Sequence, residues 1–229
     1  NLTEKYNVIQ TALASAERIM DVLDTRATLK NLDSASPEQR IANGAITFND
    51  VYFRYSPTSE EVLKGISFTL DQGQKLALVG DTGAGKSTIA ALLSRFYDVQ
   101  RGSVLIDGRD VRSYLLHNLR AGIALVPQEV VVFAGTVREN ITLGMEISED
   151  RLLECMQSVH ATFLQKLDGG LDHVLEEGGR TLSAGERQLL SFARALCFNP
   201  PILVLDEATA NIDTETESTI QKALNVLTH

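Results

Sequence analysis

The stretch Gly80-Asp81-Thr82-Gly83-Ala84-Gly85-Lys86-Ser87-Thr88 decides the fold of this protein. It follows the apolar run 75–79 and precedes the apolar run 89–93, so a strand, a glycine-rich loop and a helix are expected in that order. The pattern G-x-x-x-x-G-K-[ST] in this context predicts a phosphate-binding loop, because glycines let backbone N–H groups wrap phosphate oxygens at a helix N-terminus. The alternative is a glycine-rich turn before an ordinary helix, and the flanking strand and helix favour the phosphate site.

Charged and hydroxyl groups near the loop extend this prediction to a nucleotide with a metal ion. Lys86 supplies a positive charge for the β- and γ-phosphates, and the Ser87 hydroxyl is placed to ligate Mg²⁺. The apolar run 202–205 ends in Asp206 and Glu207. We expect Asp206 to hold Mg²⁺ through water and Glu207 to orient and deprotonate the attacking water. Because strands often end in solvated acids, this pair is strong evidence only beside the phosphate loop.

The composition is that of a folded, acidic protein. Its 229 residues are 44% hydrophobic and 22% charged, which argues against disorder and predicts one large domain or two small ones. The net charge of −9 disfavours a nucleic-acid partner bound through a general electrostatic field, but it permits a local phosphate site. No apolar run approaches the roughly 18 residues of a membrane span, so we expect a soluble domain.

The chain divides into a leading helix, a linker and a compact domain. Apolar side chains recur at a helical period over residues 2–24. Residues 25–44 mix charges with Ser34, Ser36 and Pro37, which is typical of a linker. The compact domain is expected over residues 45–229.

Within residues 45–229, short apolar runs alternate with helical patterns. Residues 46–53 suggest an edge strand or hairpin, and the runs expected to form buried strands are 76–79, 104–106, 123–126 and 202–205. The stretches expected to form helices are 86–97, 148–166, 184–198 and 214–227. This alternation predicts an α/β fold with a mostly parallel sheet.

A third motif, Leu182-Ser183-Ala184-Gly185-Glu186, opens the helical stretch 184–198. Ser183 as N-cap with Glu186 three residues later predicts a capping box. With the two motifs above, the stretch closely resembles the signature of ATP-binding cassette (ABC) transporters, whose commonest form is Leu-Ser-Gly-Gly-Gln. The resemblance implies a P-loop ATPase with a mostly parallel core sheet, an antiparallel β subdomain and an α-helical signature subdomain, which binds ATP and Mg²⁺.

The resemblance also implies roles for four further residues. Tyr55 matches the aromatic that stacks on adenine, although it also fits a half-buried strand residue. Gln128 matches a glutamine that ligates Mg²⁺ and links to the membrane domain. Glu177 falls in an acidic loop that touches the transmembrane coupling helices, and Asp213 falls in a loop that crosses the dimer interface.

Other stretches resemble exporters in particular. Residues 133–141 are typical of exporters, and residues 12–24 look like the segment that joins the last transmembrane helix to the ATPase; an amphipathic helix packed on its own domain is the alternative. The resemblance implies a motor domain at the cytoplasmic face of a bacterial plasma membrane, fused to a transmembrane domain. Two such domains would pair head to tail, each ATP lying between residues 80–88 of one and 182–186 of the other.

Two departures from the family pattern qualify this interpretation. Ala184 and Glu186 replace the usual glycine and glutamine, which leaves room for a heterodimer with unequal sites. In the family a strand with a switch histidine follows the helix that ends near His229, so we expect the chain to be a fragment of a longer protein at both ends. A soluble ABC ATPase acting on DNA or ribosomes, and the ATPase subunit of an importer, are the alternative functions.

Overall fold

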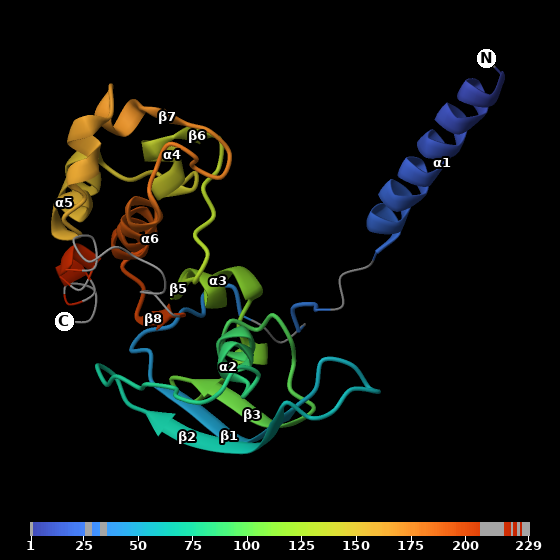
Figure 1. The fold of residues 1–229 in the computed structure, drawn as a ribbon. Coiled ribbons are helices and arrows are strands. Elements are labelled where there is room, and N and C mark those ends of the chain that lie inside the picture. Colours follow the sequence, from blue (N-terminus) through green and yellow to red (C-terminus); the bar gives the residue numbers. More distant parts are fainter. Residues whose placement is uncertain are drawn as a thin grey trace.

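The computed structural model describes residues 2–25, 29–32, 36–206, 218–220, 222–223 and 225. Figure 1 shows two lobes, one built on a sheet and one built from helices, with helix α1 (Leu2–Asp24) standing apart from both. Apolar side chains of α1 are exposed, among them Ile9, Leu13 and Ile19. In the part of the chain that is described, no helix is long and apolar enough to cross a membrane.

The sheet lobe contains a four-stranded antiparallel sheet in the order β2-β1-β3-β4. Its strands are β1 (Ile46–Phe53), β2 (Leu63–Leu70), β3 (Arg101–Ile106) and β4 (Arg109–Asp110). Inward-facing side chains such as Phe48 and Val104 pack with Leu92 of helix α2 (Lys86–Leu93). The expected strands 46–53 and 104–106 are therefore present, and both belong to the antiparallel subdomain rather than to a parallel sheet. The first lies between β2 and β3, so it is not an edge strand, but it forms the expected hairpin with β2.

Strands β5 (Ile123–Val126) and β8 (Ile202–Leu205) pair in parallel, with Ile123 opposite Ile202 and Val126 opposite Leu205. They lie between the two lobes in Figure 1. The ladder continues one residue further, because the Asp206 N–H donates to the Val126 carbonyl at 3.0 Å. Parallel pairing places the residues that follow both strands at one edge, and Gln128 and Asp206 are among them.

The expected strand over 76–79 is wrong for this structure. These residues form no strand, and Val79 is 93% exposed. A strand must satisfy its N–H and C=O groups on a neighbouring strand, and within the described ranges no segment pairs with residues 76–79. The apolar character of the run predicted burial, but burial of a sheet strand depends on neighbours that a local pattern cannot supply.

The helical lobe consists of α4 (Val137–Thr142), α5 (Glu149–Ser158), α6 (Ala184–Phe198) and the short antiparallel pair β6 (Gly135–Thr136) and β7 (Val174–Leu175). Ile141, Leu152 and Phe192, one from each helix, are fully buried in its core, where Ile220 and Ala223 also pack. The expected helix over 184–198 has these bounds, which confirms that prediction.

Two other helices are shorter than expected, for a backbone reason. Helix α2 ends at Leu93, shortly before Arg95, and α5 ends at Ser158, shortly before His160. Both Arg95 (φ 48°) and His160 (φ 54°) take left-handed conformations that stop a right-handed helix. After α5 the chain continues as a 3-10 helix over Thr162–Lys166. Of the expected helix 214–227, the described positions 218–220, 222–223 and 225 are helical.

Residues 41–45, directly before β1, lie against the sheet lobe. Ile41 is only 8% exposed and belongs to the core of that lobe. The Asp107 carboxylate accepts hydrogen bonds from the N–H groups of Ala42 at 2.8 Å and of Asn43 and Ala45 at 3.0 Å. Burial alone would raise the pKa of Asp107, but these backbone hydrogen bonds outweigh it and hold the pKa below its usual value.

Candidate nucleotide-binding site

The phosphate loop runs into α2 through a glycine that no other residue could replace without strain. Gly85 is the N-cap of α2 and has φ 91°, in the left-handed region. A Cβ atom at Gly85 would lie 2.7 Å from Cδ2 of Leu63. Residues 80–84 of the loop are exposed. The loop therefore opens to solvent directly before the N-terminus of a helix, where the helix dipole favours anions.

Lys86, the first residue of α2, folds back over this loop. Its ammonium group donates to the carbonyl of Gly80 at 2.7 Å and to the carbonyl of Asp81 at 2.9 Å. The positive charge is thus held at the loop by two neutral acceptors. Phosphate oxygens form stronger, charge-assisted hydrogen bonds with an ammonium group, so they could compete with these carbonyls.

Two predicted metal-binding residues that lie 119 positions apart in the sequence meet beside the loop. The Ser87 hydroxyl donates to Oδ2 of Asp206 at 3.2 Å. Gln128 is exposed and follows β5, the strand that pairs with the one leading to Asp206. A hydroxyl and a carboxylate at this distance fit Mg²⁺, which takes few protein ligands and completes its shell with phosphate and water oxygens. Accordingly, no group of three or more His, Cys, Asp or Glu residues forms a metal cluster in the described ranges.

Tyr55 lies close to helix α2, which follows the phosphate loop. Its hydroxyl is 2.9 Å from Oγ1 of Thr88, and its side chain is 51% exposed. The ring makes edge contacts with Phe53 and Tyr97, at centroid distances of 4.9 and 5.1 Å. Tyr97, which was not predicted, is 43% exposed and packs beside Tyr55 near the phosphate loop, whereas Phe53 is buried beneath them. The aromatic pair 96–97 just after the phosphate helix is the sequence signal that could have indicated it.

The signature residues form the N-terminus of α6, and the predicted capping box is confirmed. The Glu186 N–H donates to the Ser183 hydroxyl at 3.2 Å, and the Ser183 N–H donates to the Glu186 carboxylate at 2.8 Å. Leu182 is buried, whereas Ser183 and Ala184 are exposed. The Glu186 charge is therefore bonded to the N-cap backbone of its own helix.

A hydrogen-bond network that sequence reasoning missed ties α6 to the loop after Gln128. Arg194 donates to the carbonyl of Asn140 at 2.6 Å, to that of Val131 at 2.7 Å and to Oδ1 of Asn140 at 3.0 Å. Burial lowers the pKa of Arg194. A single arginine within a helix carries no motif, so these partners could not be read from the sequence.

The loop that contains Glu177 is held against the same segment. Glu177 is exposed in a turn, and the N–H of Gly178 donates to the carbonyl of Val132 at 2.9 Å. The predicted coupling loop and the segment after Gln128 are thus neighbours. Two further predicted residues, Glu207 and Asp213, lie outside the described residues.

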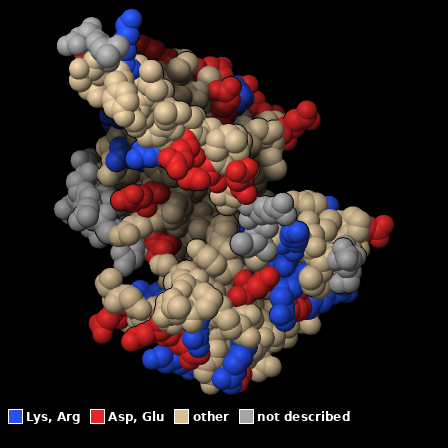
Figure 2. Space-filling view, turned by 90° about the vertical axis from the view of Figure 1, so that its right-hand side faces the viewer, with Lys and Arg blue, Asp and Glu red and all other residues tan. Residues whose placement is uncertain are grey.

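The surface carries both signs of charge. Figure 2 shows acidic side chains gathered on the upper part of one face, and Lys and Arg side chains concentrated on its lower part. Basic and acidic groups are interspersed there, so this face carries no uniform basic surface.

This chain is similar to known proteins over nearly its whole length. The family model described as "ABC transporter" matches residues 63–210. The "Probable multidrug resistance ABC transporter ATP-binding/permease protein YheH" of Bacillus subtilis (strain 168) is 45% identical over 99% of this chain and 33% of its own length. An "ATP-dependent lipid A-core flippase" of Haemophilus ducreyi is 44% identical over 99% of this chain and 39% of its own length.

A solved structure agrees with these relatives. A bacterial Atm1-family ABC exporter with ATP bound superposes with a TM-score of 0.82 at 36% identity, and covers 97% of this chain. The match takes in 39% of that exporter's chain, so this protein spans about a third to two fifths of the length of the proteins it resembles. From its motifs, its fold and these relatives, the chain belongs to the ABC transporter family and carries that family's ATPase domain.

Proposed function

We propose that this domain binds ATP with Mg²⁺, hydrolyses it, and so drives export across a membrane. The observation that carries the proposal is the Ser87–Asp206 contact of 3.2 Å beside the Lys86 loop. It joins a hydroxyl and a carboxylate separated by more than half the chain, next to an anion-binding helix terminus. This is the arrangement that a nucleotide with a divalent cation requires.

The residues divide the chemistry between them. Backbone N–H groups of residues 80–88 and the Lys86 ammonium would hold the phosphates, while Tyr55 would stack on adenine. Ser87, Gln128 and Asp206 would hold Mg²⁺, which when bound neutralises charge on the β- and γ-phosphates. Glu207 follows Asp206 directly and would orient and deprotonate the attacking water.

The second half of each site would come from another nucleotide-binding domain. Ser183 and Ala184 are exposed at the N-terminus of α6, while the Glu186 carboxylate is bonded to the Ser183 N–H. Residues 182–186 can thus present a helix N-terminus to the γ-phosphate held by a partner domain. Asp213 would lie at this head-to-tail interface. ATP would favour the closed pair and hydrolysis the open one, a shift of population between two states.

The relatives support a role in a membrane exporter, because they are named as a multidrug ATP-binding/permease protein, lipid A-core flippases and an Atm1-family exporter. We propose that residues 1–24 lead from a transmembrane domain, that residues 25–44 link it to the ATPase domain of residues 45–229, and that Glu177 contacts it. The domain would then work at the cytoplasmic face of a cell membrane, without a nucleic-acid partner.

The sharpest test replaces the proposed base. In Glu207→Gln, ATP hydrolysis should fall by about 10²–10⁴-fold, the usual contribution of a general base, while ATP binding survives. Steady-state ATPase rates and fluorescent-nucleotide titration measure the two quantities. Glu154→Gln, on an exposed face of α5, is the matched control and should hydrolyse ATP normally. Unchanged turnover in Glu207→Gln would refute the assignment of the base.

A further inference from the structure

Arg95 is a buried charge just past the end of α2. Its side chain is 2% exposed, and its Nε donates to Oδ1 of Asp98 at 2.8 Å. Its Nη2 lies 3.4 Å from the second carboxylate oxygen of Asp98, which is itself 38% exposed. One local carboxylate therefore neutralises this guanidinium but does not use all of its donors.

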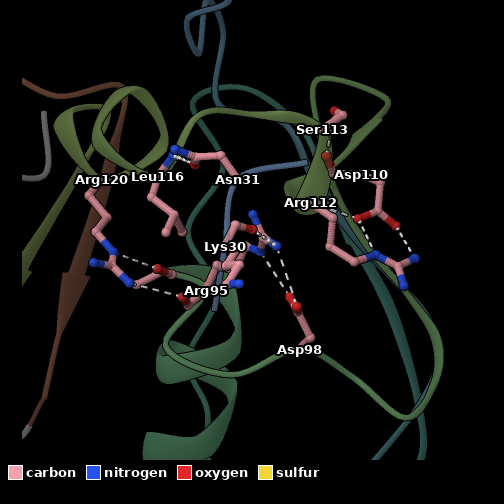
Figure 3. Close-up of polar contacts among 10 residues, drawn as sticks. Lys30, Asn31, Arg95, Asp98, Asp110, Arg112, Ser113, Leu116 and Arg120 are labelled. Atoms are coloured by element: carbon pink, nitrogen blue, oxygen red, sulfur yellow. Dashed lines mark hydrogen bonds and ion pairs between the residues drawn. The ribbon is translucent and has the colours of Figure 1, made fainter. Parts of the chain in front are cut away.

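The same guanidinium reaches back to the segment between α1 and β1. Its Nη2 donates to the carbonyl of Lys30 at 3.1 Å. The next residue, Asn31, accepts a hydrogen bond through Oδ1 from the N–H of Leu116 at 2.8 Å. Leu116 opens helix α3 (Leu116–Ala121), where N–H groups lack partners within the helix. Figure 3 shows Lys30 and Asn31 between the end of α2 and the start of α3.

Helix α3 also contacts the backbone around Arg95. Arg120 donates to the carbonyls of Ser94 at 3.3 Å and Arg95 at 3.0 Å, and its guanidinium lies 4.8 Å from the centre of the Phe96 ring. None of these contacts involves residues 29–32. These contacts hold the backbone that presents the Arg95 side chain.

The burial of the Arg95 guanidinium depends on the hydrogen bonds that its nitrogen atoms make. Nη1 is buried and has no hydrogen-bond partner among the residues that the structure describes. Burying a charged group is unfavourable unless it is hydrogen-bonded, so burial of Arg95 depends on its bonds to Asp98 and to Lys30. A shift of residues 29–32 would change the environment of this charge directly.

We propose that Arg95 is a positioning residue that clasps the linker backbone at Lys30 to the end of α2, so that nucleotide binding is transmitted to the segment leading to α1. Helix α2 is a short rigid path, because Lys86 and Ser87 stand at its start and Arg95 follows its end. The transmission half of the proposal rests on the function proposed above. The clasp itself does not.

Trypsin tests the clasp without any ligand. It cuts after lysine, and the Lys30 carbonyl that it must engage is the acceptor of the Arg95 bond, although the Lys30 side chain is exposed. In Arg95→Lys, cleavage at Lys30, followed by mass spectrometry, should accelerate about tenfold, as expected for the loss of one charge-assisted hydrogen bond. Arg40→Lys is the control, because the Arg40 bonds found among the described residues go to the nearby carbonyls of Pro37 and Gln39.

A second variant guards against simple unfolding. Asn31→Ala leaves Arg95 intact and removes the exposed bond to Leu116, so it should accelerate cleavage at Lys30 by a few-fold with an unchanged melting temperature. Cleavage at the wild-type rate in both Arg95→Lys and Asn31→Ala would overturn the clasp.

A non-hydrolysable ATP analogue tests whether nucleotide binding is transmitted to the linker at Lys30. It should change the rate of cleavage at Lys30 in the wild type, and Arg95→Lys should still bind the analogue but lose this response. If the wild type does not bind the analogue, the proposed function fails while the result without ligand still decides the clasp. If the wild type binds it and cleavage at Lys30 does not change, transmission is refuted.

Discussion

The phosphate loop and the signature helix differ in how each is held. At the signature, Ser183 and Glu186 exchange hydrogen bonds of 3.2 and 2.8 Å, and α6 packs into the core of the helical lobe. At the phosphate loop, residues 80–84 are exposed, the run before them pairs with no described strand, and Lys86 bonds to carbonyls of the loop itself. The signature half is fixed by hydrogen bonds at the N-terminus of its own helix. In the phosphate-loop half, the Lys86 ammonium group bonds to carbonyls of the loop itself.

This difference predicts unequal consequences of mutation. In the phosphate loop, residues 80–84 are exposed and the Lys86 ammonium bonds to loop carbonyls, so these groups contribute little to folding. In the signature the same hydroxyl that would face a phosphate also caps a helix. Substitution of Lys86 should therefore change nucleotide chemistry with little change in stability, whereas substitutions in the signature should change both.

Lys86→Ala should give the largest effect. It removes the loop's ammonium group, so turnover should fall by about 10²–10³-fold, as when one electrostatic stabiliser of a transition state is deleted. Because Lys86, among the described residues, donates to the Gly80 and Asp81 carbonyls of its own exposed loop, the melting temperature should hardly move. ATPase assays and thermal unfolding measure the two quantities, and a large loss of stability would contradict the contrast between the two regions.

Tyr55 gives the next effect and separates stacking from hydrogen bonding. Tyr55→Ala should weaken ATP binding by about 1–3 kcal/mol if the ring stacks on adenine. Tyr55→Phe keeps the ring and loses only the 2.9 Å bond to Thr88, so it should cost at most about 1 kcal/mol. Titration with ATP and with a ribose triphosphate that lacks the base distinguishes the two. Equal losses for both ligands in Tyr55→Ala would refute stacking.

The sequence predicted best those features that depend on neighbours along the chain. The bounds of the helix over 184–198 and its capping box follow from residues within four positions of one another. The runs 123–126 and 202–205 are confirmed as strands. The metal site expected at Ser87 and Asp206 stays a prediction.

Most of the failures share one physical cause, which is that the missing information lies far away in sequence. The run 76–79 is apolar enough for a buried strand, but it lacks a described partner. Tyr97 and Arg194 gain their importance from Tyr55 and Val131, which no local pattern connects to them. The shorter helix α2 has a different, local cause, because Arg95 takes a left-handed backbone conformation that arginine rarely adopts.

The smallest effect tests the signature half with a control inside the same lobe. Ser183 caps α6 and Thr136 caps α4, each in a capping box with a glutamate. Ser183→Ala and Thr136→Ala should therefore each lower the free energy of unfolding by about 1 kcal/mol. Only Ser183→Ala should also slow ATP hydrolysis, because only that hydroxyl would face a phosphate of the partner domain. Matched stability losses with matched activities would mean that Ser183 serves the helix alone, since a capping role is the one property that the two residues share.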